Sequence, residues 1–125
     1  MSPEAVNFLD VAERQLVEAG AALAADLYRF AAREAYNVAL SATRAIIFEK
    51  TQEAPKTHSG ARNQLSKLVH GGLGLPEGLL QYLASGYELK SDLDYGPVSP
   101  VSRAEAEQAV GAARVFLAAA RTICG

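Results

Sequence analysis

Hydrophobic residues recur at steps of three and four along almost the whole chain, and this is the period of an amphipathic α-helix. The period predicts five helices: one from Ser2 that ends or loosens near Gly20, one over about 26–51, a short one before Gly71, one over about 76–95, and one from Ser102. No stretch is β-rich, and no internal repeat is visible. The pattern therefore predicts an all-α fold, an up-and-down antiparallel helical bundle of about five helices, in a single domain over residues 1–125.

Signals at the ends of these segments support the same division. Ser2 stands before Pro3 and can cap a helix whose first position tolerates proline. Pro55 stops the second helix. Ser102 and Glu105 have the spacing of a capping box, in which each side chain satisfies a backbone amide of the other residue.

The second predicted helix carries a narrow polar stripe on an otherwise apolar surface. Five polar residues recur along it at steps of three and four: Arg29, Arg33, Asn37, Ser41 and Arg44. A helix so apolar on its other sides belongs at the centre of the bundle. The stripe then faces solvent, a cleft or a second subunit, and the wet side of a core helix explains it as well as a cleft does.

The loop that follows this helix, Lys56 to Gly60, also has two interpretations. Thr57 or Ser59 can cap the third helix, which is a structural role. The helix start also offers amide donors to an anion, with Lys56, His58 and further cations close in sequence and no acidic residue between Ala54 and Pro76. The structural interpretation is the commoner one for such a sequence.

The amino-acid composition limits the kinds of binding site and the cellular location that the chain can have. The chain has 125 residues, half of them hydrophobic, and a net charge of −2, so attraction to a phosphate backbone would need a local patch. A single cysteine, Cys124, excludes an internal disulfide and a cysteine metal cluster. No apolar run approaches the length of a membrane span. We expect a cytoplasmic protein with no membrane contact.

Motifs of common active sites are missing from the chain. There is no glycine-rich phosphate loop, no zinc-binding helix and no nucleophile elbow. Glu49 and Glu53 are four residues apart but lack the histidines of a di-iron bundle. The five tyrosines are spread over several elements and are interpreted as residues at the edge of the core. We therefore predict no metal and no cofactor.

Three segments resemble the HEPN domain family, in its compact stand-alone branch: Ala35 to Ala45 with its Ala-Tyr-Asn start, Pro55 to Gly60 with Lys-Thr-His-Ser-Gly, and Leu93 to Gly96 with Asp-Tyr. The resemblance covers nearly the whole chain. It implies a helical bundle that is commonly a homodimer and that many prokaryotes encode beside a minimal nucleotidyltransferase, in some cases as a toxin–antitoxin pair.

The chain departs from the nucleolytic members that it resembles. Those members carry an arginine, four to six further residues and then a histidine, so that one side chain stabilises phosphate charge and the other moves a proton. Here Arg62 and His70 are separated by seven residues. Lys90 and Tyr95 enclose four residues, but a tyrosine is a poor proton shuttle at neutral pH. We assign no catalytic residue and do not expect ribonuclease activity.

Three functions remain open. The first is a non-catalytic subunit that binds a nucleotide or nucleic acid and partners a nucleotidyltransferase, in a toxin–antitoxin pair. The second is a divergent metal-independent ribonuclease that uses His58 or His70 with Arg44 or Arg62, and the third is a helical scaffold for homodimerisation and partner docking. For a ligand or partner site we predict the place where the polar stripe meets the loop and the end of the fourth helix. Its residues are Arg33, Asn37, Arg44, Lys56, Thr57, His58, Lys90, Asp94 and Tyr95.

Overall fold

Five helices make up the fold in the computed structural model: α1 (Pro3–Ala24), α2 (Tyr28–Thr51), α3 (His58–His70), α4 (Leu79–Tyr95) and α5 (Arg103–Cys124). The structure describes the backbone of residues 1–95 and 100–125, and the side chains of residues 1–87 and 100–125. Within these ranges every regular element is a helix. The predicted all-α bundle is confirmed.

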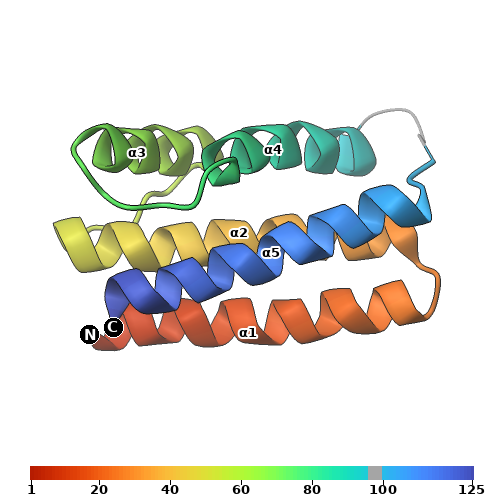
Figure 1. The fold of residues 1–125 in the computed structure, drawn as a ribbon, viewed down its shortest axis with the longest axis horizontal. Helices are drawn as coiled ribbons and strands as arrows, with labels where there is room; N and C mark the ends of the chain where they lie inside the picture. Colours follow the sequence, from red (N-terminus) through yellow and green to blue (C-terminus); the bar gives the residue numbers. More distant parts are fainter. Residues whose placement is uncertain (96–99) are drawn as a thin grey trace.

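Helix α2 lies at the centre of the bundle. It packs against each of the other four helices, with α1 and α5 on one side and α3 and α4 on the other. Figure 1 shows α3 and α4 following each other along α2 in one layer, while α1 and α5 lie beneath them. Because the chain doubles back over residues 52–57, His58 at the start of α3 lies beside Tyr36 in the first half of α2.

The core is rich in alanine. Buried alanines recur along α1, α2 and α5, and their small side chains let these three helices approach closely. The largest fully buried side chains include Tyr36 and Phe116. The central position predicted for the second helix is confirmed by thirteen buried residues along α2.

Helix starts follow the predicted capping chemistry. The Ser2 hydroxyl accepts a hydrogen bond from the Ala5 amide at 3.2 Å, and both partners of the Ser102–Glu105 capping box are present. Thr57 caps α3, because its Oγ1 accepts from the Gly60 amide at 2.9 Å. The structural interpretation of the Lys56–Gly60 loop therefore holds for Thr57.

Three predicted helix boundaries are wrong by a few residues. Helix α1 continues through Gly20 to Ala24, since one glycine weakens a helix without breaking it when the rest of the face is packed. Helix α2 begins at Tyr28 rather than near residue 26, because Asp26 has a φ of 62° and interrupts the helical path. Helix α4 begins at Leu79, directly after Gly78 with a φ of 89°.

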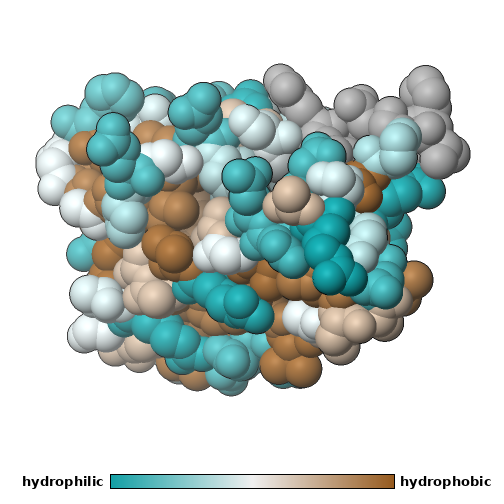
Figure 2. Space-filling model, turned by 45° about the vertical axis from the view of Figure 1, so that its right-hand side comes forward, coloured by the Kyte–Doolittle hydropathy of each residue, from teal (hydrophilic) through white to brown (hydrophobic). Residues whose placement is uncertain are grey.

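On the face shown in Figure 2, hydrophobic residues form separate patches among hydrophilic ones. Among the described residues, no helix is both long and apolar enough to cross a lipid bilayer.

Candidate functional site

Three aromatic rings from three helices meet on one side of α2. The hydroxyl of Tyr36 in α2 lies 2.8 Å from Nδ1 of His58 at the start of α3, and the two rings are stacked, with centroids 5.7 Å apart and an interplanar angle of 12°. The ring of Tyr87 in α4 lies 5.0 Å from His58 and 6.4 Å from Tyr36. We call Tyr36, His58 and Tyr87 the three-ring cluster.

The cluster passes from the core to the surface. Tyr36 is 2% exposed, His58 is half-buried, and Tyr87 is 39% exposed. Tyr87 and part of His58 therefore face solvent, while Tyr36 is buried.

The loop before α3 explains why His58 is held in this place. Thr57 caps the helix, and Gly60 provides the amide that the cap needs. A Cβ at position 60 would lie 2.8 Å from Thr57 Oγ1, so a larger residue would push the cap away. The Lys-Thr-His-Ser-Gly segment thus forms the cap and the first helical residues of α3, and it holds His58 at the helix start.

Helix α4 reaches the cluster through Gly86. A Cβ at this position would lie 2.6 Å from Cδ2 of Tyr36, a separation that real side chains do not adopt. Glycine therefore lets the α4 backbone lie against the Tyr36 ring, and the next residue, Tyr87, is placed beside His58.

The electrostatics of the cluster favour a neutral phenol. Burial raises the pKa of Tyr36 to about 12, and neighbouring Tyr87 adds to this rise. The positive charges of Arg44 and Arg62 lower the same pKa, so both guanidinium groups act on the cluster. Tyr36 therefore keeps its proton at neutral pH and can donate it to Nδ1 when the His58 proton is on Nε2.

The structure brings together only some of the predicted site residues. His58 is a member of the three-ring cluster, and Arg44 acts on the cluster through its charge. Lys56 is exposed in the loop just before α3. The Arg33 guanidinium lies 5.0 Å from the Phe30 ring centroid, and Asn37 donates to Glu34 at 3.1 Å. Lys90, Asp94 and Tyr95 lie within α4, but their side chains are outside the described residues.

One member of the polar stripe departs from the prediction. Ser41 is 5% exposed, and its hydroxyl donates to Gln15 of α1 at 2.8 Å. The expectation that it faces solvent, a cleft or another subunit is wrong because α1 covers it. Three further stripe residues, Arg33, Asn37 and Arg44, are half-buried.

Sequence reasoning does not assign the site to Tyr36, Gly86 or Tyr87, because it interprets the tyrosines only as residues at the edge of the core. Tyr36 carries one signal, its place in the Ala-Tyr-Asn segment of the family resemblance. For Gly86 and Tyr87 the signal is only a glycine next to an aromatic residue inside a helix.

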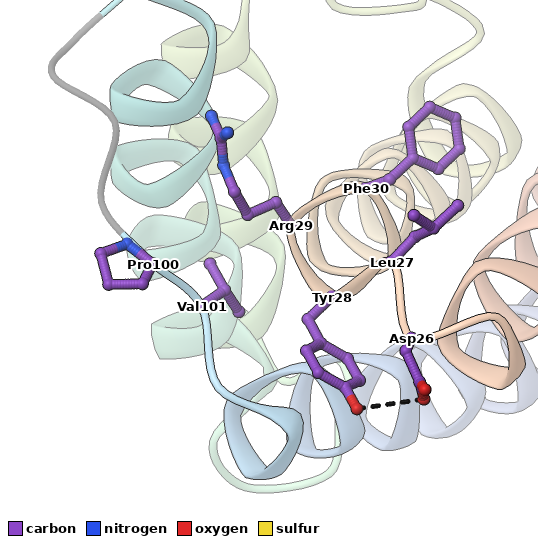
Figure 3. Close-up of a pocket in the computed structure, with 7 residues that line it drawn as sticks. All are labelled: Asp26, Leu27, Tyr28, Arg29, Phe30, Pro100 and Val101. Carbon is purple, nitrogen blue, oxygen red and sulfur yellow. Dashed lines mark hydrogen bonds between the residues drawn. The ribbon is translucent and has the colours of Figure 1, made fainter.

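A hollow at the N-terminal end of α2 is a weaker candidate. It has a volume of about 450 Å³ and is lined by Asp26, Leu27, Tyr28, Arg29, Phe30, Pro100 and Val101 (Figure 3). The Tyr28 hydroxyl donates to Asp26 at 3.1 Å, and Arg103 binds both, at 2.9 Å and 2.8 Å. Because Asp26 and Tyr28 are bound to each other and to Arg103, the hollow offers a ligand mainly apolar surface, with Arg29 as its further charged lining residue.

Within the described part of the chain, no group of three or more histidine, cysteine or acidic side chains is arranged to hold a metal ion. The three-ring cluster combines aromatic rings and a partly buried hydrogen bond with the positive charges of Arg44 and Arg62.

Comparison with known proteins agrees with this fold. The family model of the HEPN domain matches residues 5–123, which is nearly the whole chain. The chain belongs to the HEPN domain family. A search of the solved structures found TT1696 from Thermus thermophilus, with a TM-score of 0.81 and 22% sequence identity over 98% of this chain and 99% of that one. At this identity the likeness supports the fold of the HEPN domain alone. No curated protein matched the sequence.

Proposed function

We propose that this HEPN domain is a non-catalytic subunit that binds a nucleotide or nucleic acid at the three-ring cluster. The observation that carries the proposal is the convergence of His58 and the exposed Tyr87 with the positive charges of Arg44 and Arg62 around Tyr36. Aromatic rings stack on nucleobases, and arginines bind phosphate through charge-assisted hydrogen bonds. These are the two groups that every nucleotide presents.

Each residue then has a distinct role. Tyr87, the most exposed ring, stacks on the base. Arg44 and Arg62 hold the phosphate. Tyr36 fixes the orientation of His58 through the 2.8 Å hydrogen bond, so that the imidazole keeps one position beside the stacked base.

Two features favour binding without cleavage. No arginine precedes either histidine by the four to six residues that nucleolytic members of the family use. Tyr36 stays protonated near neutral pH because burial raises its pKa to about 12, so its hydroxyl is a poor general base. The purified protein is expected to leave RNA intact.

The test is a titration of the purified protein with AMP and with a short RNA. Replacing Tyr87 or Arg62 with alanine should weaken binding about tenfold or more, which corresponds to the loss of one stacked base or one charged contact. Arg114→Ala on α5 is the matched control, since Arg114 is exposed and lies outside the cluster. If every variant binds like the wild type, or if the wild type binds nothing, the proposal is wrong.

The partners proposed for this subunit are a second copy of the chain and a minimal nucleotidyltransferase, in the prokaryotic cytoplasm and in a toxin–antitoxin setting. This part of the proposal comes from the family resemblance. A nucleotidyltransferase gene next to this one, together with co-purification of the two products, would support it. A chain with neither such a neighbour nor any nucleotide binding would instead be a helical scaffold.

A divergent ribonuclease is the second candidate, because the positive charges of Arg44 and Arg62 lower the pKa of Tyr36, which is the hydrogen-bond partner of His58. A cation beside a histidine is the combination that metal-independent RNA cleavage requires. Cleavage of a tRNA or mRNA fragment that survives stringent purification and is lost in His58→Ala would establish this function in place of the first.

A further inference from the structure

Charge is distributed unevenly along the chain. Residues 54–76 contain Lys56, Arg62, Lys67 and two histidines, and no acidic residue. All fourteen acidic residues and nine of the twelve lysines and arginines lie elsewhere, so the rest of the chain has a net charge of −5. Helix α3 and its preceding loop are therefore a basic segment of an acidic protein.

The basic segment faces outward. Helix α3 buries Ala61 and Leu65 against the bundle, while Ser59, Asn63, Lys67 and His70 are exposed. Lys56 is exposed just before the helix starts. We call these five exposed residues the α3 outer face.

The composition of this face distinguishes between two kinds of partner. Among the described residues, none of the exposed large hydrophobic side chains belongs to α3. Protein interfaces are built around aromatic or aliphatic residues at their centre. Contacts to a phosphate backbone are instead made by lysine and arginine together with serine, asparagine and other small polar side chains. The α3 outer face matches the second description.

Arg62 connects this face to the three-ring cluster. It follows His58 by four residues, so the two lie one turn apart on the same side of α3. Its positive charge also lowers the pKa of Tyr36. A strand whose terminal nucleotide occupied the cluster could therefore continue along α3, which at thirteen residues is about 20 Å long.

We propose that the α3 outer face binds the phosphate backbone of a single-stranded nucleic acid whose end nucleotide lies at the three-ring cluster. The inference rests on the proposed function and extends it from a nucleotide to a strand. The strand is single because a base can stack on Tyr87 only when it has left its own duplex stack. The contacts are to the backbone, so RNA and DNA strands of one sequence should bind within a few-fold of each other.

The experiment compares AMP with a twelve-nucleotide single-stranded RNA on Lys56→Glu and Lys67→Glu. Each variant should bind the RNA at least tenfold more weakly and should bind AMP within about twofold of the wild type. The slope of log affinity against log salt should fall by about 0.7 for each phosphate contact removed. Lys50→Glu, an exposed change of equal charge in the last turn of α2, is the control and should affect RNA binding much less.

Several outcomes would overturn the inference. Unchanged RNA affinity in both variants, or an equal loss in Lys50→Glu, would show that the α3 outer face is not a specific contact. So would a wild type that binds AMP but holds the RNA no more tightly. Competition for this face by polyglutamate in place of RNA would identify an acidic protein as its partner. If the RNA depends on Lys67 while AMP does not bind, the nucleotide site of the proposed function fails and the α3 contact stands.

Discussion

The absence of a Cβ atom at two glycines determines how the helices pack around the site. Gly60 leaves room for the threonine cap that sets the start of α3, and Gly86 leaves room for the Tyr36 ring beneath α4. In both cases the missing Cβ would come closer than 3 Å to a neighbouring side-chain atom. At the residue scale, the geometry of the site therefore requires glycine, with no side chain, at positions 60 and 86.

Gly86→Ala should therefore destabilise the protein, although alanine favours a helix. The new Cβ would displace either α4 or the Tyr36 ring, and overpacking of this kind costs about 1–3 kcal/mol. Thermal unfolding followed by circular dichroism measures the change. Gly111→Ala in α5 is the matched control, because no atom lies within 4 Å of a Cβ there, and it should raise stability by about 1 kcal/mol. A stabilised Gly86→Ala would contradict the close packing.

At Thr43, by contrast, a substitution is expected to stabilise the protein. It is 0% exposed in α2, and its hydroxyl has no hydrogen-bond partner among the described residues. Because a buried polar group without a partner is costly, Thr43→Val should raise stability by about 1 kcal/mol in denaturant unfolding. Thr43→Ser keeps the hydroxyl and loses a methyl group, so it should lower stability by a similar amount. Equal effects of the two changes would refute this account.

Residue-scale features are predictable from sequence only where they are local. The caps at Ser2, Thr57 and Ser102 can be predicted because donor and acceptor lie within three residues of each other. The burial of Tyr36 and Ser41 cannot, since it depends on which other helix crosses α2 at that level. Helical periodicity predicts the face of the helix on which a residue lies. It does not predict which other helix packs against that face.

At the scale of elements, polar groups of α1 and α2 meet at both ends of the helix pair, with opposite effects on stability. The Ser2 amide and hydroxyl donate to Glu49 at 3.0 Å and 3.1 Å, and these bonds lower the pKa of Glu49. Toward the other end of the pair, Glu34 of α2 meets Glu18 of α1. Burial raises the pKa of Glu34, and Glu18 adds to the rise, whereas Asn37 and Arg33 lower it.

Glu34→Gln should stabilise the protein at neutral pH. A raised pKa in the folded state means that ionised Glu34 disfavours folding, so stability is greatest below the unfolded pKa and falls as the pH rises through the folded one. Glutamine carries no charge, so the variant does not lose stability as the pH rises. Its melting temperature should be about 2 °C above that of the wild type at pH 7, and this difference should disappear near pH 4. Asn37 is retained as a partner, because an amide can still accept its hydrogen bond. A variant that is less stable at pH 7 would contradict the repulsion.

Helix existence is easier to predict than helix ends. All five segments are expected from the sequence, because apolar steps of three and four over many residues are a strong signal. Glycine misleads the prediction at position 20, where packing on both sides keeps α1 continuous. Asp26 carries no recognisable turn motif, and its left-handed backbone is visible only in the structure.

At the scale of the whole molecule, the bundle leaves an apolar groove uncovered between α1 and the end of α2. It has a volume of about 290 Å³ and is lined by Glu4, Asn7, Phe8, Val11, Phe48 and Ala54. Half-buried aromatic side chains beside open space are typical of surfaces that meet another protein.

The three-ring cluster itself could not be predicted as a unit, since it needs side chains from three helices.

The proposed homodimer gives the prediction at this scale. Sedimentation at micromolar concentration should yield twice the mass of the 13.2 kDa chain. If the groove takes part, Phe48→Asp should shift the protein to monomer while its helical content stays unchanged. Val115→Asp in α5 is the control, because this valine is exposed away from the groove and should leave the dimer intact. If the wild type sediments as a monomer, the proposed homodimer is wrong.

The pairing of α1 with α5 has a consequence for biosynthesis. Ribosomes make α1 and α2 early, but α5 packs against both of them and is translated last (Figure 1). Until residues 103–124 are available, the nascent helices have no cover for their alanine-rich surface, and such exposed intermediates are prone to aggregate. Translation that stops before α5 would therefore yield an insoluble product, although the chain would still carry every residue of the three-ring cluster.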